Sequence, residues 1–452
     1  MAIKNTNFSF EKIDDLFKNS KKIFFVGIGG ISLSTIATFC LQCGKEIYGY
    51  DQKRSKESAK LEAHAKIKYY STPDSVYGMD LVIYSNAISE DNFEYQGAKK
   101  LQIPTLSRAN FLGYVASRCK NSIVISGTHG KSTTTSFLAR ILDYAGYSPS
   151  VFCGAKMKDY DSAYLKGSGE CGVFEGCEYM DSFLSFEPSI CGILNIEYDH
   201  PDYFESYEDV LSSFTKFISQ SKKAVVNIDD KGVNSILGLI GKNRIVTFSL
   251  RDKGADYYAS LKNDGFVCYH DKKRVLEAPL NLRGEHFALD AICASVIALE
   301  LGASPIAISY ALSEATGVKR RLEFIKKLDT GLSVFEDYAH HPTEILAAYS
   351  SLKEMGFKKI LCAFQAHTFS RTHYLYDDFL SSLSKFDELI ILPTFCAREN
   401  NEFGVSESEL ARALGGTFVD TLEKMVSLVK ESKCDCGVIM GAGDITEFKK
   451  YL

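Results

Sequence analysis

Short apolar runs recur along the whole chain, and polar turns followed by amphipathic stretches separate most of them. Runs of four to seven residues rich in Val, Ile and Phe have the composition and length of buried strands. Predicted strands are 21–27, 46–50, 81–85, 122–126, 172–175, 190–195, 224–229, 245–249, 332–336, 359–364, 388–392 and 436–440, with a hairpin-like stretch at 257–275. Helical periodicity follows several of them, most clearly over 133–144, 284–302 and 343–355. The alternation predicts an α/β protein with mainly parallel sheets.

The length of 452 residues is too great for one hydrophobic core and suggests about three domains at about 150 residues each. We place boundaries near 118 and 317, which gives domains 1–118, 119–317 and 318–452. Each is predicted to contain a mainly parallel sheet: Rossmann-like in the first and third, and a mononucleotide-binding P-loop sheet in the second.

Composition narrows the class of protein further. Hydrophobic residues make up 45% and charged residues 24%, as in ordinary soluble domains. A net charge of -5 argues against nucleic-acid binding, which requires a basic surface. No apolar stretch approaches the ~18 residues of a membrane span, and the first 22 residues lack a signal-peptide core. We therefore expect a cytoplasmic protein with no membrane or nucleic-acid partner.

The thirteen cysteines do not have the spacing of a metal site or a disulfide framework. Many lie inside apolar runs, where a free thiol behaves as a small hydrophobic group in a reducing compartment. We therefore expect free thiols.

The segment 122–135, Ser-Ile-Val-Ile-Ser-Gly-Thr-His-Gly-Lys-Ser-Thr-Thr-Thr, joins a predicted strand to a predicted helix. Gly127 and Gly130 allow backbone N–H groups to point at one oxyanion, and the helix N-terminus adds partial positive charge. Lys131 is placed to reach nucleotide phosphates, while the hydroxyl of Ser132 or Thr133 suits Mg²⁺. The alternative is a glycine-rich turn without chemistry, and we favour ATP binding.

A second glycine-rich loop, Gly-Ile-Gly-Gly-Ile-Ser at 27–32, follows the first predicted strand. With the acidic Asp51 about 20 residues further on, it is close to a dinucleotide fingerprint, although Ser32 replaces the third glycine. Read alone, it favours NAD. Because Lys131 has no use in a dehydrogenase, a substrate carrying a pyrophosphate explains both loops better.

Polar residues follow several predicted strands, at the edge where parallel sheets bind ligands. Ser85 and Asn86 end one strand, and Arg108 follows another, where phosphate binding and a surface role are equally probable readings. Glu175 and His200 follow strands of the central region, and the carboxylate suits Mg²⁺ better than the imidazole does. From these positions alone, metal binding and a structural role are equally favoured for Glu175. A structural role is favoured for His200.

The third region contains Asp-Tyr-Ala-His-His-Pro at 337–342 after a predicted strand. Three titratable side chains in five positions are costly to bury without a purpose. A predicted helix follows this segment. A second polar segment, at 365–371, follows the next predicted strand.

Taken together, these segments resemble the Mur ligases over essentially the whole chain, and most specifically the members that join L-alanine to UDP-N-acetylmuramate. The motifs carrying the resemblance are those at 27–30, 127–134, 175–179, 195–200, 317–321, 337–342 and 364–371. The resemblance implies three domains that bind the UDP substrate, ATP and the amino acid in chain order. It also implies ATP, Mg²⁺, UDP-N-acetylmuramate and L-alanine as ligands, in a monomer or weak homodimer.

The resemblance assigns roles to individual residues. Those expected at the UDP substrate are Gly27, Gly29, Gly30, Ser32, Asp51, Ser85, Asn86 and Arg108. Those expected at ATP are Gly127, Thr128, His129, Gly130, Lys131, Ser132, Thr133, Asp290, Arg321 and Asp337. Those expected at the metal are Ser132, Glu175 and His200, and those at the amino acid are Tyr338, His341 and Arg371. Lys131, His341 and Arg371 are the predicted catalytic residues.

The sequence departs from the family pattern at several of these places. Asp290 stands where relatives have the adenine-contacting Asn, and Phe287 where an Asn follows the matched histidine. Thr368 and Ala366 stand where many relatives have Arg and Pro, so Arg371 is expected to carry more of the carboxylate recognition alone.

The implied reaction begins when the lactyl carboxylate of the substrate attacks the γ-phosphate of ATP, giving an acyl phosphate. Lys131, Arg321 and one or two Mg²⁺ ions would offset the repulsion between the two anions. The amine of L-alanine then displaces phosphate. His341 either orients or deprotonates this amine or is a structural histidine beside Pro342.

Three other functions remain open at this stage. One is an NAD(P)-dependent dehydrogenase, based on the loop at 27–32. Another is a nucleotide-switched binding protein without synthetic chemistry. The third is a ligase of the same family that attaches a recycled peptide to the same UDP-sugar or acts later in the pathway.

Overall fold

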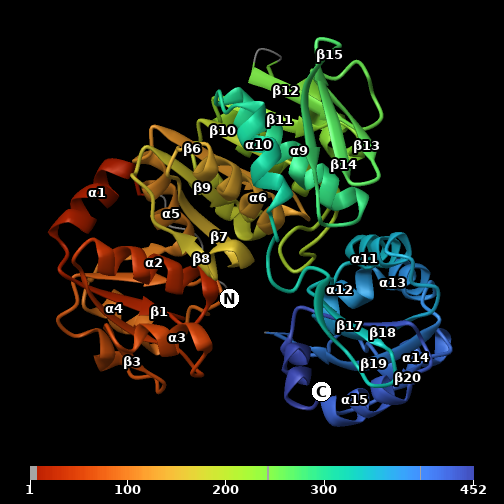
Figure 1. Ribbon diagram of the computed structural model, residues 1–452. Coiled ribbons are helices and arrows are strands. Elements are labelled where there is room, and N and C mark those ends of the chain that lie inside the picture. Colours follow the sequence, from red (N-terminus) through yellow and green to blue (C-terminus); the bar gives the residue numbers. More distant parts are fainter. Residues whose placement is uncertain (1–7, 242–243, 398) are drawn as a thin grey trace. The chain divides into compact units, whose positions relative to one another are not determined.

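Three separate β-sheets organise the chain, with helices packed on them (Figure 1). The structure is a computed structural model, and it describes residues 8–241, 244–397 and 399–452. Close contacts divide the chain into two compact units. Unit 1 contains residues 1–197, 207–279 and 290–316, and unit 2 contains 198–206, 280–289 and 317–452. The predicted α/β architecture of three domains on mainly parallel sheets is confirmed.

The first sheet has five parallel strands in the order β3-β2-β1-β4-β5. Its strands are β1 (Lys22–Val26), β2 (Glu46–Tyr50), β3 (Ala65–Lys68), β4 (Leu81–Tyr84) and β5 (Thr105–Ser107). Its helices are α1 (Phe10–Asn19), α2 (Ile31–Gln42), α3 (Lys56–Leu61), η1 (Pro73–Val76), α4 (Phe93–Lys100) and α5 (Arg108–Ser117). Since the strand order reverses between β1 and β4, a ligand crevice is expected beyond their carboxyl ends.

The second sheet has ten strands in the order β15-β14-β13-β12-β11-β10-β6-β9-β7-β8. The strands are β6 (Asn121–Ser126), β7 (Ser150–Met157), β8 (Ser162–Leu165), β9 (Cys171–Glu175), β10 (Ile190–Ile193), β11 (Lys223–Asn227), β12 (Ile245–Ser249), β13 (Tyr257–Lys262), β14 (Gly265–His270) and β15 (Lys273–Pro279). The seven from β7 to β13 pair in parallel, and antiparallel strands lie at both ends. The predicted hairpin is thus part of a three-stranded meander.

Most helices of this central region connect its strands, and the last two follow the meander. They are α6 (Lys131–Tyr144), η2 (Lys158–Tyr160), η3 (Tyr179–Ser185), α7 (Tyr207–Gln220), α8 (Lys231–Ile236), η4 (Leu237–Leu239), α9 (Glu285–Glu300) and α10 (Pro305–Ser313). Helix α6 begins directly after the predicted phosphate loop, two residues earlier than the sequence pattern suggested.

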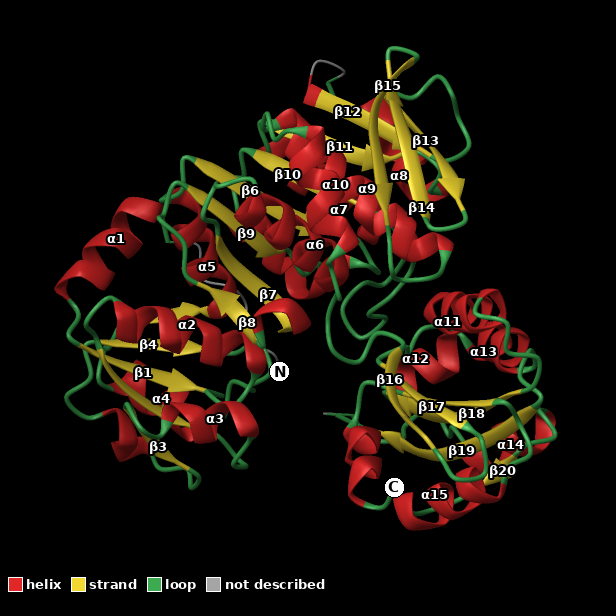
Figure 2. Ribbon diagram, in the orientation of Figure 1, coloured by secondary structure: helices red, strands yellow, loops and turns green. Residues whose placement is uncertain are grey.

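The third sheet has the order β16-β17-β21-β18-β19-β20, and only β16 pairs antiparallel. Its strands are β16 (Glu323–Lys327), β17 (Ser333–Asp337), β18 (Ile360–His367), β19 (Glu388–Phe395), β20 (Thr417–Phe418) and β21 (Cys436–Met440). Its helices are α11 (Pro342–Glu354), α12 (Phe369–Tyr374), α13 (Tyr376–Leu383), α14 (Glu407–Ala413), α15 (Leu422–Glu431) and η6 (Asp444–Lys450). Figure 2 shows α11 and α13 on one side of this sheet and α15 on the other.

Within unit 1, the first sheet's helices pack tightly against the central region. Helix α5 meets η3 at Gly113, where an added Cβ would lie 1.9 Å from the carbonyl oxygen of Ser185. Phe39 of α2 lies edge-to-face against Phe152 of β7, with ring centroids 5.8 Å apart. Only glycine permits the backbone approach at position 113.

Two properties expected from composition can be compared with the structure. All thirteen cysteines are free thiols. Among the described residues, no helix is long and apolar enough to span a membrane.

Candidate functional site

The predicted phosphate loop joins β6 to α6 in the described structure, as the sequence indicated. Gly127 and Gly130 have φ values of +142° and +86°, in the region that favours glycine. Helix α6 starts at Lys131 without a side-chain cap, so its first N–H groups remain available to an anion. The loop therefore has the backbone geometry of an anion cradle.

Asn195, just after β10, fixes this loop from the side. Its backbone carbonyl accepts the Thr128 N–H at 3.0 Å. Its side-chain amide accepts the His129 N–H at 2.7 Å and donates to the His129 carbonyl at 3.2 Å. The loop is thus held before any ligand arrives, which reduces the entropy lost on binding.

Lys131 turns back over its own loop. Its ammonium donates to the carbonyls of Gly127 at 2.6 Å and Thr128 at 3.0 Å, and contacts both Glu178 carboxylate oxygens at 2.9 and 3.1 Å. Burial by itself would lower the pKa of Lys131, but the carboxylate of Glu178 raises it above its usual value. The side chain is therefore a permanent cation at the cradle.

Ser132 and Glu175, two of the three predicted metal ligands, lie side by side. The Ser132 hydroxyl donates to the Glu175 carboxylate at 2.8 Å, and the same oxygen accepts the Gly154 N–H at 2.7 Å. A Cβ at Gly154 would meet this carboxylate at 2.4 Å. A hydroxyl and a carboxylate are oxygen donors of the kind Mg²⁺ selects, so this pair fits the ion. Thr133, the alternative hydroxyl, is buried in the first turn of α6.

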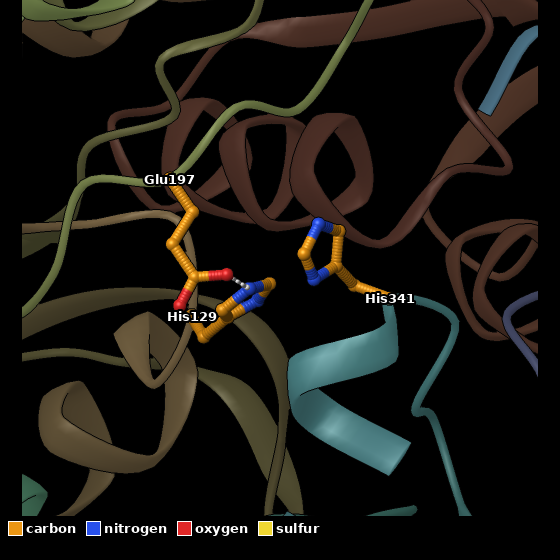
Figure 3. Close-up of side chains that lie close together, drawn as sticks. All are labelled: His129, Glu197 and His341. Carbon is orange, nitrogen blue, oxygen red and sulfur yellow. Dashed lines mark ion pairs between the residues drawn. The ribbon is translucent and has the colours of Figure 1, made fainter. Parts of the chain in front are cut away.

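Further polar groups surround the loop. His129 Nε2 lies 3.5 Å from a carboxylate oxygen of Glu197, as Figure 3 shows for these two side chains. The Glu197 N–H donates to the Thr128 hydroxyl at 2.9 Å. Asp290, the predicted adenine contact, is buried with its carboxylate against Gly130, where an added Cβ would lie 2.3 Å from it. A negative charge therefore stands beside the start of α6.

The first glycine-rich loop has a different internal arrangement. The Gly29 N–H donates to Asp51 Oδ2 at 2.8 Å, so the residue predicted at the UDP substrate holds the loop itself. Gly27, with φ +88°, packs against Ser85, where a Cβ would lie 3.2 Å from that side chain. Gly30 is the residue before α2 and has no side-chain cap, which leaves the helix N-terminus open to a pyrophosphate.

Arg108 and Asn86 lie where this loop faces the central region of unit 1. Arg108 donates to the Ser32 hydroxyl at 3.1 Å. Asn86, which is buried, donates to the Ser182 hydroxyl at 2.8 Å. The structure thus brings the predicted UDP-substrate residues together beyond the carboxyl ends of β1, β2 and β4.

In unit 2, Arg371 forms a buried ion pair. Its Nε donates to Asp199 Oδ1 at 2.8 Å, and its Nη1 donates to the His367 carbonyl at 2.9 Å. Burial of Asp199 by itself would raise the pKa of its carboxyl, but the Arg371 charge holds this pKa well below its usual range. His200, the third predicted metal ligand, adjoins Asp199, with its Nε2 3.8 Å from the carboxylate.

The Asp-Tyr-Ala-His-His-Pro segment forms a second charged cluster in unit 2. Arg321 donates to Glu344 at 2.9 Å and lies over the ring of Tyr338 at 5.4 Å. Asp337 accepts two backbone N–H groups, yet burial raises its pKa to about 6. Burial lowers the pKa of His340 to about 3. Burial therefore shifts both groups toward their neutral forms, and at pH 7 His340 is neutral while Asp337 is still mostly a carboxylate.

His341 is the residue before α11, and its Nδ1 accepts the Thr343 N–H at 3.3 Å. A nitrogen that accepts a hydrogen bond carries no proton, so this contact favours the neutral tautomer protonated at Nε2. The contact supports the structural reading of His341.

The sequence interpretation missed three carboxylates that neutralise the predicted cations. Glu178, Asp199 and Glu344 pair with Lys131, Arg371 and Arg321, respectively. Each lies within a motif already singled out or within a few residues of one. An acidic residue three positions after Glu175 was the available signal for Glu178.

Comparison with known proteins identifies the family. Three domain models match in chain order: "Mur ligase family, catalytic domain" at 22–120, "Mur ligase middle domain" at 125–298 and "Mur ligase, glutamate ligase domain" at 320–443. The chain belongs to the Mur ligase family. The predicted enzyme class, an ATP-dependent ligase that forms an amide bond, is confirmed by this membership and by the relatives below.

Similar Mur ligases match nearly the whole chain. UDP-N-acetylmuramate–L-alanine ligase of Caldicellulosiruptor bescii is 39% identical over 94% of this chain and 97% of its own. That of Clostridium acetobutylicum is 37% identical over 97% and 98%. The crystal structure of UDP-N-acetylmuramate-alanine ligase from Thermotoga maritima matches with a TM-score of 0.81 and 27% identity, over 95% and 98% of the chains.

A murein peptide ligase from Psychrobacter arcticus also shares the fold. It matches with a TM-score of 0.74 over 95% of this chain and 98% of its own, at 20% identity. At this identity the likeness concerns the fold alone.

Proposed function

We propose that this Mur ligase joins L-alanine to the lactyl carboxylate of UDP-N-acetylmuramate, using ATP and passing through an acyl phosphate. The observation that carries the proposal is the preorganised loop at 127–132 with its largely buried cation Lys131, on a chain that matches L-alanine-adding relatives over nearly its full length. The product would enter peptidoglycan precursor synthesis in the cytoplasm.

The loop at 127–132 would bind the triphosphate of ATP through backbone N–H groups and the N-terminus of α6. Lys131 would neutralise the γ-phosphate as the substrate carboxylate approaches, which lowers the repulsion between two anions. Ser132 and Glu175 would hold Mg²⁺, which supplies further charge neutralisation on the phosphates when bound. We assign His200 to the same ion on family resemblance.

The first domain, 1–118, is proposed to hold the UDP substrate. Its loop at 27–32 and the N-terminus of α2 would take the pyrophosphate, with Arg108 as an adjacent cation. Asp51 holds the loop through the Gly29 N–H, so its proposed effect on the substrate is at least partly indirect.

Unit 2 is proposed to recognise the amino acid and complete the nucleotide site. Arg321 and Asp337 are assigned to ATP, and Tyr338, His341 and Arg371 to L-alanine. The amine attacks the acyl carbon as its free base, and loss of phosphate from the tetrahedral species leaves the amide. Neutral His341 can accept the amine proton only if its Nδ1 exchanges the Thr343 contact for the substrate.

Phosphate release tests the proposal directly. The purified enzyme with ATP and Mg²⁺ should release phosphate only when both UDP-N-acetylmuramate and L-alanine are present. Glycine, L-serine and a short peptide in place of L-alanine test the specificity, and greater activity with the peptide would replace the proposal by peptide recycling. Phosphate release that ignores the amino acid would indicate a nucleotide switch instead.

A further inference from the structure

Glu178 is a buried carboxylate placed directly on the cation of the phosphate loop. Its side chain is 3% exposed, and both oxygens lie within 3.1 Å of Lys131 Nζ. Glu178 follows β9 by three residues and immediately precedes η3. It is separate from Glu175, which instead contacts Ser132 and Gly154.

The contacts of Lys131 use all the donors that it has. An ammonium carries three N–H bonds, and here they serve the carbonyls of Gly127 and Thr128 and the carboxylate of Glu178. A phosphate oxygen can therefore receive a hydrogen bond from Lys131 only by displacing one of these acceptors. Glu178 is the one acceptor among them that carries a full negative charge, so it competes most strongly with a phosphate.

The backbone fixes Glu178 in this position. Met180 and Asp181 both have φ of +54°, a left-handed conformation that residues with a side chain rarely adopt. Backbone hydrogen bonds from Asp181 to Glu178 and from Phe183 to Cys177 close the turn. A strained turn of this kind persists only where the surrounding contacts determine it.

The first domain contributes to the same turn. The Ser182 hydroxyl donates to the Tyr179 carbonyl at 2.7 Å and accepts from the Asn86 amide at 2.8 Å. Asn86 follows β4, at the edge proposed to hold the UDP substrate. Through Ser182, the turn that carries Glu178 is therefore linked by hydrogen bonds to Asn86 of the first domain.

We propose that Glu178 is a positioning residue that holds Lys131 away from the phosphate position until ATP displaces it. This inference rests on the proposed ATP site. Without nucleotide, Glu178 keeps the Lys131 ammonium ordered, and it sets a cost on nucleotide binding because the ion pair must separate. Removal of its charge should therefore tighten ATP binding by way of Lys131.

Direct binding of ATP to the full-length enzyme, without turnover, tests this role. Calorimetry with Glu178→Gln is expected to give a Kd for ATP about tenfold lower than that of wild type, with and without Mg²⁺. Glu178→Asp keeps the charge but moves it back by one methylene, so we expect a smaller decrease in the Kd for ATP. Glu170→Gln, which neutralises an exposed carboxylate just before β9, should leave the Kd unchanged.

A double variant separates positioning from simple charge repulsion. In Lys131→Met the Glu178→Gln change should bring no further tightening, because its effect passes through the ammonium. Three results would overturn the proposal. Glu178→Gln could tighten ATP binding equally with Lys131 and with Met at position 131, it could leave ATP binding by the otherwise wild-type enzyme unchanged, or it could weaken ATP binding in the presence of Mg²⁺. The last result would make Glu178 a metal ligand.

The measurement is independent of the overall reaction. If ATP binds but L-alanine does not stimulate phosphate release, the proposed reaction fails while the role of Glu178 is still tested. A thermal unfolding curve for each variant verifies that it is folded at the binding temperature. Should Glu178→Gln fail to fold, the Kd of Glu178→Asp decides, and an unchanged value would refute the role.

Discussion

Lys131 of unit 1 and Arg371 of unit 2 are both predicted catalytic cations, and each is paired with a buried carboxylate. Lys131 donates to two carbonyls of its own loop, three and four residues away, as well as to Glu178, and its side chain is 14% exposed. Arg371 is held by Asp199, 172 positions away, and is 4% exposed. Lys131 can therefore exchange a partner for a ligand at modest cost, whereas Arg371 also joins distant segments of unit 2.

The difference teaches that burial of a cation does not by itself indicate one role. A partly exposed pair beside an open helix N-terminus suits a group that must move toward a substrate. A more deeply buried guanidinium that pairs with a distant carboxylate suits a group whose position is part of the fold. Arg371→Ala consequently tests stability as well as amino-acid recognition.

Substitution of Lys131 is expected to have the largest effect on activity. Lys131→Ala should lower kcat by about 10³-fold or more, because the charge that offsets two approaching anions is lost. The variant should still bind UDP-N-acetylmuramate, as measured by calorimetry. Loss of both functions together would contradict the separate roles of the two glycine-rich loops.

Substitution of Arg371 should instead reduce stability first. Arg371→Ala leaves Asp199 buried without its cation, and we expect the free energy of unfolding to fall by about 3–5 kcal/mol, measured by urea denaturation. Adding Asp199→Asn should recover part of this loss. If stability is unchanged and only KM for L-alanine rises, Arg371 acts on the substrate alone and the contrast with Lys131 disappears.

The pH dependence of stability should originate in unit 2 through His340. The pKa of His340 falls from 6.5 to about 3 on folding, so the unfolded chain binds more protons between these values and stability decreases as the pH falls below 6.5. From pH 7 to 5 this contributes about 2 kcal/mol of destabilisation. His340→Gln should reduce the pH difference by about that amount in urea titrations.

Asp337 acts in the opposite direction and provides a control. Its pKa rises from 3.8 to about 6 on folding, so the folded state binds more protons in that interval and this group stabilises at lower pH. Asp337→Asn should therefore enlarge the loss of stability between pH 7 and 5. If His340→Gln lost more stability between pH 7 and 5 than the wild type does, the pH dependence could not be assigned to His340.

A smaller effect is expected at the carboxylate next to the Lys131 loop. In Gly154→Ala the new Cβ would meet Glu175 at 2.4 Å, so this carboxylate must shift away from Ser132. We expect the Mg²⁺ concentration for half-maximal activity to rise about fivefold, with stability changed by about 1 kcal/mol. Gly146→Ala gives a control in open space at positive φ, where only backbone strain is added.

Much of this arrangement could be predicted from local sequence. The strand, loop and helix around Lys131 were predicted within two residues, because a short β-branched run, two glycines and a helical period occur together. The strands β2, β12 and β21 were predicted at their observed bounds. The separate strands β7 and β8 and the short β3 were not predicted, since their apolar patterns are brief or interrupted.

The pairing of charges could not be predicted in the same way. Asp199 is within a motif already noted, but its partner Arg371 is far away in sequence and no periodicity links them. The inclusion of 198–206 and 280–289 in unit 2 likewise depends on tertiary packing. Roles toward ATP, Mg²⁺ and the UDP substrate remain predictions for the experiments above.

The missing side chain at Gly113 has a practical consequence for inhibitor design. Because the backbones of α5 and η3 touch there, the first sheet and the phosphate loop have little freedom to slide past one another. A bisubstrate compound that tethers a sugar-nucleotide mimic to an ATP mimic would then need one linker length, and a stiff linker of that length should gain most from effective concentration.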